Sequence, residues 1–154
     1  MLQNFESLVL IWLGIGFITF ITLLKIPAPY GKFSKTNWGP MIPSKLGWIV
    51  MEIISPLALL YFFLNGNIEK SPTNITFISL WTLHYFNRSV IYPLRQNNPA
   101  KMPLLIAVLA FLFNVMNGYI NGTYFGSIQE YSAEYMSNWN FIVGVCLFIT
   151  GAYI

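Results

Sequence analysis

Five apolar runs occupy most of the sequence, and their length limits what the chain can form. A bilayer core about 30 Å thick is crossed by roughly 20 apolar residues in a helix. The runs are Leu8–Leu24, Leu46–Leu64, Ile75–Leu94, Met102–Tyr119 and Phe141 to the last residue. The fifth run is short for a span, so its helix would begin earlier, near Trp139, or continue in further sequence. We therefore predict an all-α fold, a polytopic transmembrane helix bundle of about five spans, in an integral, multi-pass membrane protein.

Composition supports a membrane protein and excludes several other classes. Only 8% of the 154 residues are charged, whereas about a quarter are charged in soluble domains. One cysteine and one histidine exclude an internal disulfide framework and Cys- or His-rich metal sites. The net charge of +3 is too modest for a nucleic-acid surface. We predict one transmembrane domain over residues 1–154, in contact with membrane lipid, with no metal and no nucleic-acid partner.

Basic loop residues predict the orientation of the bundle, because Lys and Arg concentrate on the cytoplasmic side. The loops "PAPYGKFSKTNWGPMIPSK" and "RQNNPAKMP" contain most of them, and the loop "NGNIEKSPTN" contains one. Six basic residues, Lys25, Lys32, Lys35, Lys45, Arg95 and Lys101, are expected on one side, against Lys70 on the other. The N-terminus is therefore predicted to be non-cytoplasmic. Glycosylation sequons at Asn74 and Asn121 would face away from the cytoplasm, but such motifs are common by chance.

Two ionisable residues, Glu52 and Arg88, fall inside apolar runs. Such a residue costs about 2.5 to 3.5 kcal/mol on insertion scales and is by default a functional hypothesis. Each lies about 9 Å from the cytoplasmic end of its run, so the two have matching depth. Tyr85 and Tyr92 share a helical face with Arg88, and Trp81 lies one turn deeper. A row of hydrogen-bond donors is thus predicted to face one carboxylate.

A second polar stripe lies on the fourth run. Asn114, Asn117 and Asn121 recur at spacings of three and four residues, and Gly118 and Gly122 lie among them. Small residues allow another backbone, or a ligand, to approach a helix closely. The asparagines are candidates for ligand contacts, although interhelical hydrogen bonding is the commoner role of such residues.

A structural interpretation is open for the other groups as well. Glu52 and Arg88 could pair simply to hold two helices together. Trp48 and Tyr92 lie near predicted membrane interfaces, where aromatic belts are common. His84 is interpreted as a core residue. Several polar groups at compatible depths, however, exceed what packing requires, and this convergence favours a functional site.

A buried carboxyl beside a phenol suggests one chemistry. Desolvation disfavours the carboxylate anion, so Glu52 would tend to keep its proton and donate it in a hydrogen bond. Glu52 and Tyr85 would then offer two donors to one carbonyl oxygen and polarise an enone toward hydride addition. If Arg88 instead neutralises Glu52, that second donor is lost. The two assignments therefore compete.

The sequence resembles the steroid 5-alpha-reductase family of membrane oxidoreductases. The resemblance rests on "PAPYGKF", "WGPMIPSKLGWIVMEIISP", "LWTLHYFNRSVIYPLR" and "FNVMNGYINGTYF", in this order. It implies NADPH-dependent reduction of the 4,5 double bond of a 3-oxo-4-ene steroid. It further implies that Glu52 and Tyr85 bind the 3-oxo group, as the catalytic pair. The residues expected to bind substrate or support the site are Arg88, Tyr92, Trp48, Asn114 and Asn117.

The resemblance covers the N-terminal half of the family's sequence. Family members continue into helices and loops that hold most of the nicotinamide cofactor, so the cofactor-binding residues are expected mostly beyond Ile154. Either the chain is truncated or a second polypeptide supplies the C-terminal half. The chain alone is expected to present the steroid side of a site without turnover. The implied location is the endoplasmic reticulum in a eukaryote or the inner membrane in a bacterium.

Two other functions stay open at this point. A reductase of the same fold could act on a polyprenol or an enoyl-CoA lipid. A non-catalytic subunit could bind a sterol or act as a scaffold for a partner.

Overall fold

The computed structural model describes residues 2–35, 37–97 and 101–153, and these are predominantly helical. The principal helices are α1 (Leu2–Lys25), α2 (Ser44–Leu64), α3 (Pro72–Phe86), α5 (Leu104–Thr123) and α6 (Trp139–Tyr153). Two π turns prolong helices: η2 (Asn87–Ile91) links α3 to α4 (Tyr92–Arg95), and η3 (Tyr124–Ile128) follows α5. Short 3-10 turns are η1 (Gly31–Phe33) and η4 (Ala133–Ser137). The all-α prediction is confirmed.

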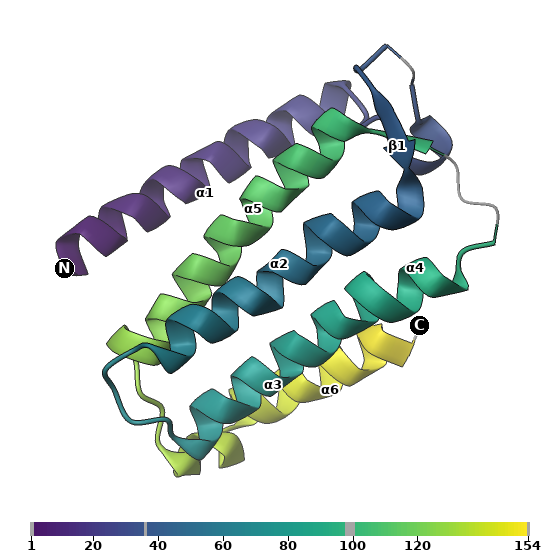
Figure 1. Ribbon diagram of the computed structural model, residues 1–154. Coiled ribbons are helices and arrows are strands. Elements are labelled where there is room, and N and C mark those ends of the chain that lie inside the picture. The colour runs from purple at the N-terminus through teal and green to yellow at the C-terminus, as the bar shows by residue number, and fades with distance from the viewer. Residues whose placement is uncertain (1, 36, 98–100, 154) are drawn as a thin grey trace.

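The five predicted runs correspond to five helical rods that alternate in direction (Figure 1). Among the described residues, three helices are long and apolar enough to cross a membrane: Leu2–Lys25, Ser44–Leu64 and Leu104–Ile128. A shorter apolar helix, Trp139–Tyr153, begins at the residue suggested for the fifth run. The fourth run is shifted, since Met102 lies in a strand and the helix begins at Leu104. Helix length and composition identify a membrane protein.

Prolines and one serine set where the helices begin. Pro43 precedes α2, Pro103 precedes α5, and Pro72 is the first residue of α3. Proline suits a helix N-terminus because its fixed φ is already helical and its missing N–H has no partner there. Ser71 caps α3, and its hydroxyl accepts a hydrogen bond from the backbone N–H of Asn74 at 3.2 Å. These residues fix where α2, α3 and α5 begin.

Helix α2 is the centre of the bundle and packs most extensively against α5, then against α3 and η2. Glycines on α5 make the close approach possible. A Cβ atom at Gly118 would lie 2.7 Å from the Cβ of Ala58 and 2.8 Å from the carbonyl oxygen of Ser55. At Gly122, one turn later, it would lie 2.6 Å from the carbonyl oxygen of Leu59. The glycine spacing predicted to admit another backbone therefore faces α2.

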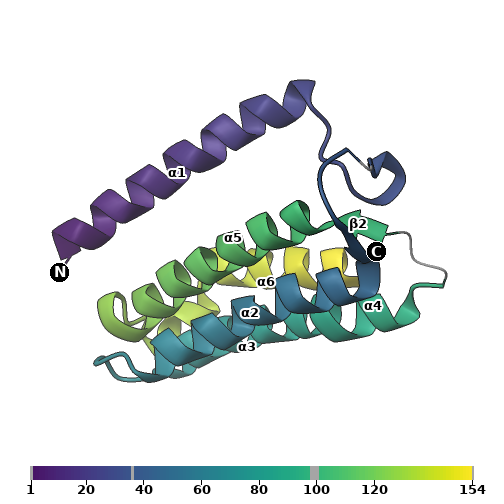
Figure 2. The same ribbon diagram turned by 45° about the horizontal axis from the view of Figure 1, so that its top comes forward.

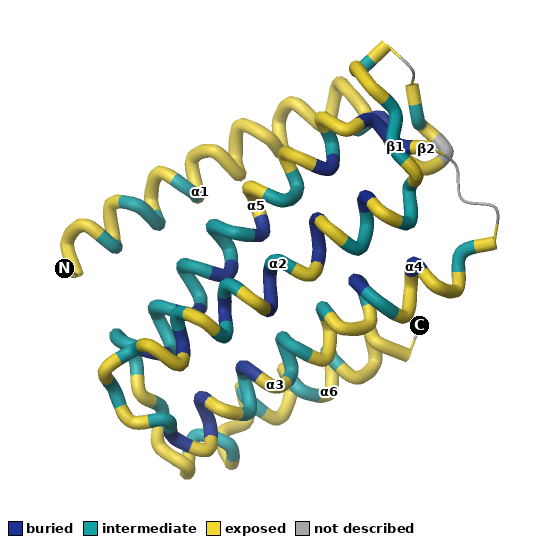
Figure 3. Tube along the Cα trace, viewed as in Figure 1, coloured by how far each residue is buried: buried dark blue, intermediate teal, exposed yellow. Residues whose placement is uncertain are grey.

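The buried side chains form two small clusters along α2. One contains Met51, Met102 and Ala107, and the other contains Leu59, Phe63 and Ile78. Helices α1 and α6 have no buried residues in the described chain, and Figure 3 shows both as mainly exposed with a few intermediate positions. Figure 2 shows α1 set apart from the other helices. The tightly packed part of the fold is thus α2, α3 and α5.

A two-stranded sheet joins the two loops that the sequence assigns to the cytoplasmic side. Strand β1 (Met41–Pro43) pairs antiparallel with β2 (Lys101–Pro103), with Ile42 opposite Met102. From their Pro- and Gly-containing sequence, both segments were expected to be irregular loops. Pairing satisfies backbone groups that a loop would leave to solvent, and it brings the basic segments to one end of the bundle.

The opposite end is held by the buried side chain of Asn74, at the start of α3. Its amide nitrogen donates to the carbonyl oxygens of Phe125 and Gln129, both at 2.9 Å. Its amide oxygen accepts from the backbone N–H of Tyr131 at 3.1 Å. Asn74 is fully buried. This sequon residue therefore ties the chain after α5 to the beginning of α3.

Candidate functional site

The carboxylate of Glu52 and the guanidinium of Arg88 meet where α2 packs on η2. Arg88 Nη2 donates to Glu52 Oε1 at 2.5 Å. Glu52 is 4% exposed, while the side chain of Arg88 is 41% exposed. Of the two alternatives left open by the sequence, this structure contains the ion pair. In this arrangement Glu52 accepts a hydrogen bond rather than donating one.

Arg88 lies in the π turn η2, between Tyr85 and Tyr92. A π turn inserts extra backbone into a helix and is often found at functional sites. The guanidinium lies 5.3 Å from the ring centroid of Trp48, which is a cation–π distance. Trp48 also contacts Tyr92 edge to face at 5.2 Å between centroids. Trp48, Arg88 and Tyr92 therefore form one group between α2 and the end of the α3 rod.

Tyr85 is held by Asn114 on α5. The Tyr85 hydroxyl donates to Asn114 Oδ1 at 3.2 Å, and Asn114 Nδ2 donates to the backbone carbonyl of Met51 at 2.6 Å. Asn114 is buried, with 4% of its surface exposed. The Met51 carbonyl thereby orients the Asn114 oxygen toward the phenol. The side chain of Asn114 on α5 thus links α2 to α3.

The rest of the asparagine stripe is arranged differently. Asn121 Nδ2 donates to the backbone and side-chain oxygens of Asn117 at 2.9 and 3.1 Å. These contacts remain within α5 and involve no other helix. Asn117 is therefore not joined to Tyr85 or Glu52 by these bonds, whereas Asn114 binds Tyr85 directly.

Trp81 covers one face of Tyr85. The two rings stack with centroids 5.3 Å apart and planes 24° apart. The indole Nε1 donates to the hydroxyl of Ser55, a fully buried residue of α2, at 3.2 Å. This hydrogen bond fixes the orientation of the Trp81 ring, and the stacked Trp81 ring in turn limits the rotation of the Tyr85 side chain.

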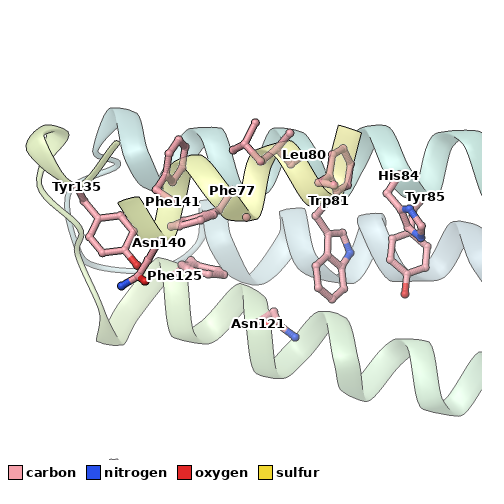
Figure 4. A pocket seen from close by; sticks show the side chains of 13 residues that line it. Phe77, Leu80, Trp81, His84, Tyr85, Asn121, Phe125, Tyr135, Asn140 and Phe141 are labelled. Carbon is pink, nitrogen blue, oxygen red and sulfur yellow. The ribbon is translucent and has the colours of Figure 1, made fainter. Parts of the chain in front are cut away.

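Tyr85 lies at one end of an aromatic pocket between α3, α5 and α6, with a volume of about 590 Å³. Figure 4 shows the lining side chains, with His84 and Tyr85 at one end and Tyr135 and Asn140 at the other. The lining residues are Phe77, Leu80, Trp81, His84, Tyr85, Asn121, Phe125, Tyr135, Asn140, Phe141, Gly144, Val145 and Phe148. The volume lies within the range of small-molecule sites. The pocket suits a flat apolar ligand.

Sequence reasoning missed much of this pocket. His84 was interpreted as a core residue, but it is exposed and lines the pocket. The residues from α6 and the preceding turn, including Tyr135, Asn140 and Phe141, were not identified. Their apolar pattern indicates only a span, and nothing local in the sequence reveals which helix α6 faces. The one available signal was the concentration of tyrosines between the fourth and fifth runs.

Two ionisable groups in the turn after α5, outside the spans, have shifted pKa values. Burial, assisted by a hydrogen bond with the Tyr124 side chain, raises the pKa of Tyr131 to about 12. A hydrogen bond from the Ser132 side chain, and then one from its own backbone N–H, lower the pKa of Glu134. The Tyr131 shift reports local burial and the Glu134 shift reports local hydrogen bonding in this turn, rather than the chemistry of the pocket.

A smaller polar pocket lies beyond Trp48, at the end of the bundle where the strands pair. Its volume is about 330 Å³, and Tyr30, Tyr92, Gln96 and Lys101 contribute to its walls. The buried Oε1 atom of Gln96 has no hydrogen-bond partner among the described residues. A buried acceptor without a partner is unusual in folded proteins, so this pocket is a candidate for a polar ligand. Within the described ranges, no group of three or more His, Cys, Asp or Glu residues could hold a metal ion.

Comparison with known proteins gives consistent matches. Residues 100–154 match the family model described as 3-oxo-5-alpha-steroid 4-dehydrogenase. "Steroid 5-alpha-reductase DET2" of Arabidopsis thaliana is 37% identical over 146 residues, which is 88% of this chain and 55% of that protein. The protein of the same name from Gossypium hirsutum is 36% identical, with the same coverage of each chain. "3-oxo-5-alpha-steroid 4-dehydrogenase 1" of Bos taurus is 26% identical over 95% of this chain and 58% of that protein.

The apolar helices and the polar site between them indicate an all-α membrane protein. Over most of its length the chain is similar to members of the steroid 5-alpha-reductase family. It spans a little more than half the length of the curated relatives it matches.

Proposed function

We propose that the chain provides the steroid-binding part of a membrane oxidoreductase that reduces the 4,5 double bond of a 3-oxo-4-ene steroid with NADPH. One observation carries this proposal: Tyr85, whose hydroxyl is held by Asn114, lines one end of an aromatic pocket. The names of the relatives support the same reaction class. The pocket would take the rings, and the phenol would bind the ketone.

Tyr85 is assigned the main role in activating the ketone. Its hydroxyl would turn from Asn114 to donate a hydrogen bond to the 3-oxo oxygen. Negative charge develops on that oxygen when a hydride adds at the far carbon of the enone, so a donor there stabilises the transition state. The cation of Arg88, three residues further along the same rod, would favour the same charge. Asn114 would accept the hydroxyl again once product leaves.

Glu52 is assigned a supporting role while the ion pair with Arg88 persists. The carboxylate holds the guanidinium in place, and Trp48 packs against it on another side. Tyr92 completes this group through its contact with Trp48. Direct donation from Glu52 to the ketone would require a proton on Glu52 and release of Arg88. The free-energy difference between the Glu52–Arg88 ion pair and a protonated, unpaired Glu52 decides which assignment applies.

The polar pocket at Gln96 fits part of a nicotinamide dinucleotide. Its unpaired acceptor suits an amide or hydroxyl donor, and Lys101 favours an anionic group. When bound, the cofactor supplies a hydride. Tyr30, Gln96 and Lys101 would bind and orient one end of it, and Trp48 would separate this pocket from bulk water. Most cofactor contacts are proposed to lie in the part of the relatives' length that this chain does not span.

We further propose the arrangement in the membrane. The five rods cross it with the β1–β2 end at the cytoplasmic side, because six of the seven basic loop residues belong to segments at that end. The N-terminus is then non-cytoplasmic. The membrane would be the endoplasmic reticulum in a eukaryote or the inner membrane in a bacterium.

A competition experiment on the chain in lipid nanodiscs tests the proposed substrate class. A radiolabelled 3-oxo-4-ene steroid should bind saturably, and excess polyprenol or enoyl thioester should not displace it. Stronger displacement by either lipid would overturn the steroid assignment in favour of that substrate. Absence of saturable steroid binding would contradict the proposal as a whole.

Turnover separates a reductase from a non-catalytic subunit. Product formation from steroid and NADPH is assayed after co-expression of the chain with the C-terminal half of the Arabidopsis relative. The proposal expects product in this mixture, and severe loss with Tyr85→Phe despite preserved helicity. A complex that assembles and binds steroid but forms no product would favour the non-catalytic function.

A further inference from the structure

A second groove lies between α2 and α3, with a volume of about 550 Å³. Figure 1 shows these two helices side by side. The residues that line the groove are Leu60, Phe63, Leu64, Lys70, Ile75, Ile78, Ser79, Thr82 and Leu83. The α3 residues among them lie on the face opposite the one that lines the aromatic pocket. The groove is therefore a separate feature of the bundle.

The walls of this groove are almost entirely apolar. Its two hydroxyl groups are bonded to their own helix: Ser79 donates to the carbonyl of Ile75 and Thr82 to that of Ile78, both at 2.8 Å. They leave the wall without a free polar group. Leu64 and Leu83 are largely exposed, so the groove opens outward from the bundle. On a membrane protein, an apolar groove with this opening faces lipid.

Lys70 is the one charged residue that lines the groove within the described part of the chain. Its ammonium donates to the carbonyl oxygens of Gly66 and Ile68 at 2.8 Å, and to that of Gly126 at 3.4 Å. The third contact is longer than an ordinary N–H···O hydrogen bond, so one N–H is available to a better acceptor. Carbonyl groups are neutral, and Lys70 has no carboxylate partner among the described residues. Its positive charge remains uncompensated.

The fold holds this charge at the end of the groove. The Lys70 Nζ atom lies 5.4 Å from the ring centroid of Phe63, a buried residue of α2, at a cation–π distance. The carbonyls of Gly66 and Ile68 belong to the turn that follows α2. The ammonium is therefore positioned before a ligand binds, and little side-chain entropy is lost on binding.

The length of the groove matches one leaflet of a bilayer. Ile75 and Leu83 are eight residues apart on α3, which corresponds to about 12 Å. Half of a hydrocarbon core about 30 Å thick is about 15 Å. Lys70 lies just beyond the end of α2, a helix long and apolar enough to span the membrane. The groove thus has a cation at its interfacial end and an apolar wall about as long as one leaflet is thick.

We propose that this groove binds one acyl chain of a membrane phospholipid and that Lys70 binds the phosphate of the same lipid. A phosphate oxygen would accept the N–H that now reaches Gly126, and the short bonds to Gly66 and Ile68 would persist. Hydrogen bonds between two charged groups are stronger than those to a neutral carbonyl. The bound lipid would pack against α2 and α3 together. This inference does not depend on the proposed function, because no residue lines both pockets.

Photocrosslinking of the complete chain in nanodiscs tests this site. Two lipid probes carry the same diazirine-labelled acyl chains: a phosphatidylglycerol, whose headgroup contains a phosphate, and a diacylglycerol, which has none. Mass spectrometry locates the label, and only label on groove residues of α2 and α3 is counted. At equal probe content, the phospholipid should label the wild-type groove about 5-fold more than the diacylglycerol, as expected for one lysine at a lipid surface.

Variants of Lys70 identify the group that selects the phosphate. Lys70→Gln removes the charge and should abolish the preference for the phospholipid, whereas Lys70→Arg keeps the charge and should retain most of it. Lys45→Gln is the matched control, because Lys45 is also partly buried but lies at the other end of α2. This control should retain the full preference.

Three results would overturn the inference. Equal labelling of the wild-type groove by both probes would show that it takes acyl chains without regard to the headgroup, whether or not the variants fold. Absence of label from the groove with both probes would show that lipid does not occupy it. A preference that Lys45→Gln abolishes as fully as Lys70→Gln would reflect the overall charge of the chain rather than this site.

Discussion

Glu52 of α2 and Arg88 of η2 form an ion pair across the interface between two helices. Glu52 is buried, whereas Arg88 is half-exposed and also packs on Trp48. The carboxylate is thus shielded from water but has a cation as partner. This relationship supports the proposal that Glu52 holds Arg88 in place and that Tyr85 meets the ketone.

Glu52→Gln should destabilise the chain by about 1 to 2 kcal/mol, because a charge-assisted hydrogen bond becomes a neutral one. Arg88→Gln should cost a similar amount, and the double variant less than the sum, since the two residues act as a pair. Thermal unfolding of the wild-type chain, the two single variants and the double variant, followed by circular dichroism in detergent, measures this double-mutant cycle. Glu69→Gln, an exposed change, is the control. Strict additivity would show that the ion pair does not form.

Asn114→Ala should destabilise the chain by about 1 to 3 kcal/mol, because it leaves the Met51 carbonyl without its donor. It should also weaken steroid binding by freeing Tyr85. The matched control is Asn117→Ala, one turn away, whose side chain pairs only within α5. Unfolding and binding measurements on both variants check the difference. Equal effects of the two changes would contradict the assigned contacts.

Gly118→Ala should destabilise the α2–α5 contact by about 1 to 3 kcal/mol, because the added methyl group overlaps Ala58 and the Ser55 carbonyl. Gly16→Ala is its counterpart on α1, where nothing lies within 4 Å of the added atom. It should be neutral or stabilising by up to about 1 kcal/mol, since alanine favours helix. Melting temperatures of the two variants test the close approach. A neutral Gly118→Ala would contradict it.

Tyr131 should make stability fall at high pH. Its pKa rises from 10.0 to about 12 on folding, mainly through burial, so the folded state holds this proton more tightly. The stabilisation is complete below pH 10 and is lost as pH rises through about 12. Tyr131→Phe should remove this slope, while Tyr153→Phe, a change at a highly exposed residue, should keep it. Denaturant unfolding between pH 9 and 12 provides the test.

Much of the architecture could be predicted because membrane helices have a strong local signal. Length and hydrophobicity placed the rods, and the basic loops predicted that the segments around Met41 and Lys101 lie at one end. The β1–β2 pairing was missed because three-residue strands have no pattern of their own and depend on a partner distant in sequence. The π turn was also missed, since helical periodicity does not reveal an inserted residue.

The candidate site was predictable as a set of residues more than as a set of contacts. Helical spacing placed Tyr85, Arg88 and Tyr92 together, and insertion cost singled out Glu52. Spacing alone could not tell which donor each acceptor would take, so the choice between Arg88 and a ligand for Glu52 stayed open. The pairing of Tyr85 with Asn114 depends on the rotation of α5 about its axis, which Gly118 sets through packing on α2.

The most direct test of the role proposed for Tyr85 measures the carbonyl stretching frequency of the bound steroid. Infrared difference spectra are recorded for a 3-oxo-4-ene steroid, carbon-13 labelled at its carbonyl, bound to the wild-type chain and to Tyr85→Phe. The account predicts a lower carbonyl stretching frequency in the wild-type complex, because the Tyr85 hydroxyl withdraws electron density from the oxygen. Identical frequencies in the two complexes, at equal occupancy, would contradict it.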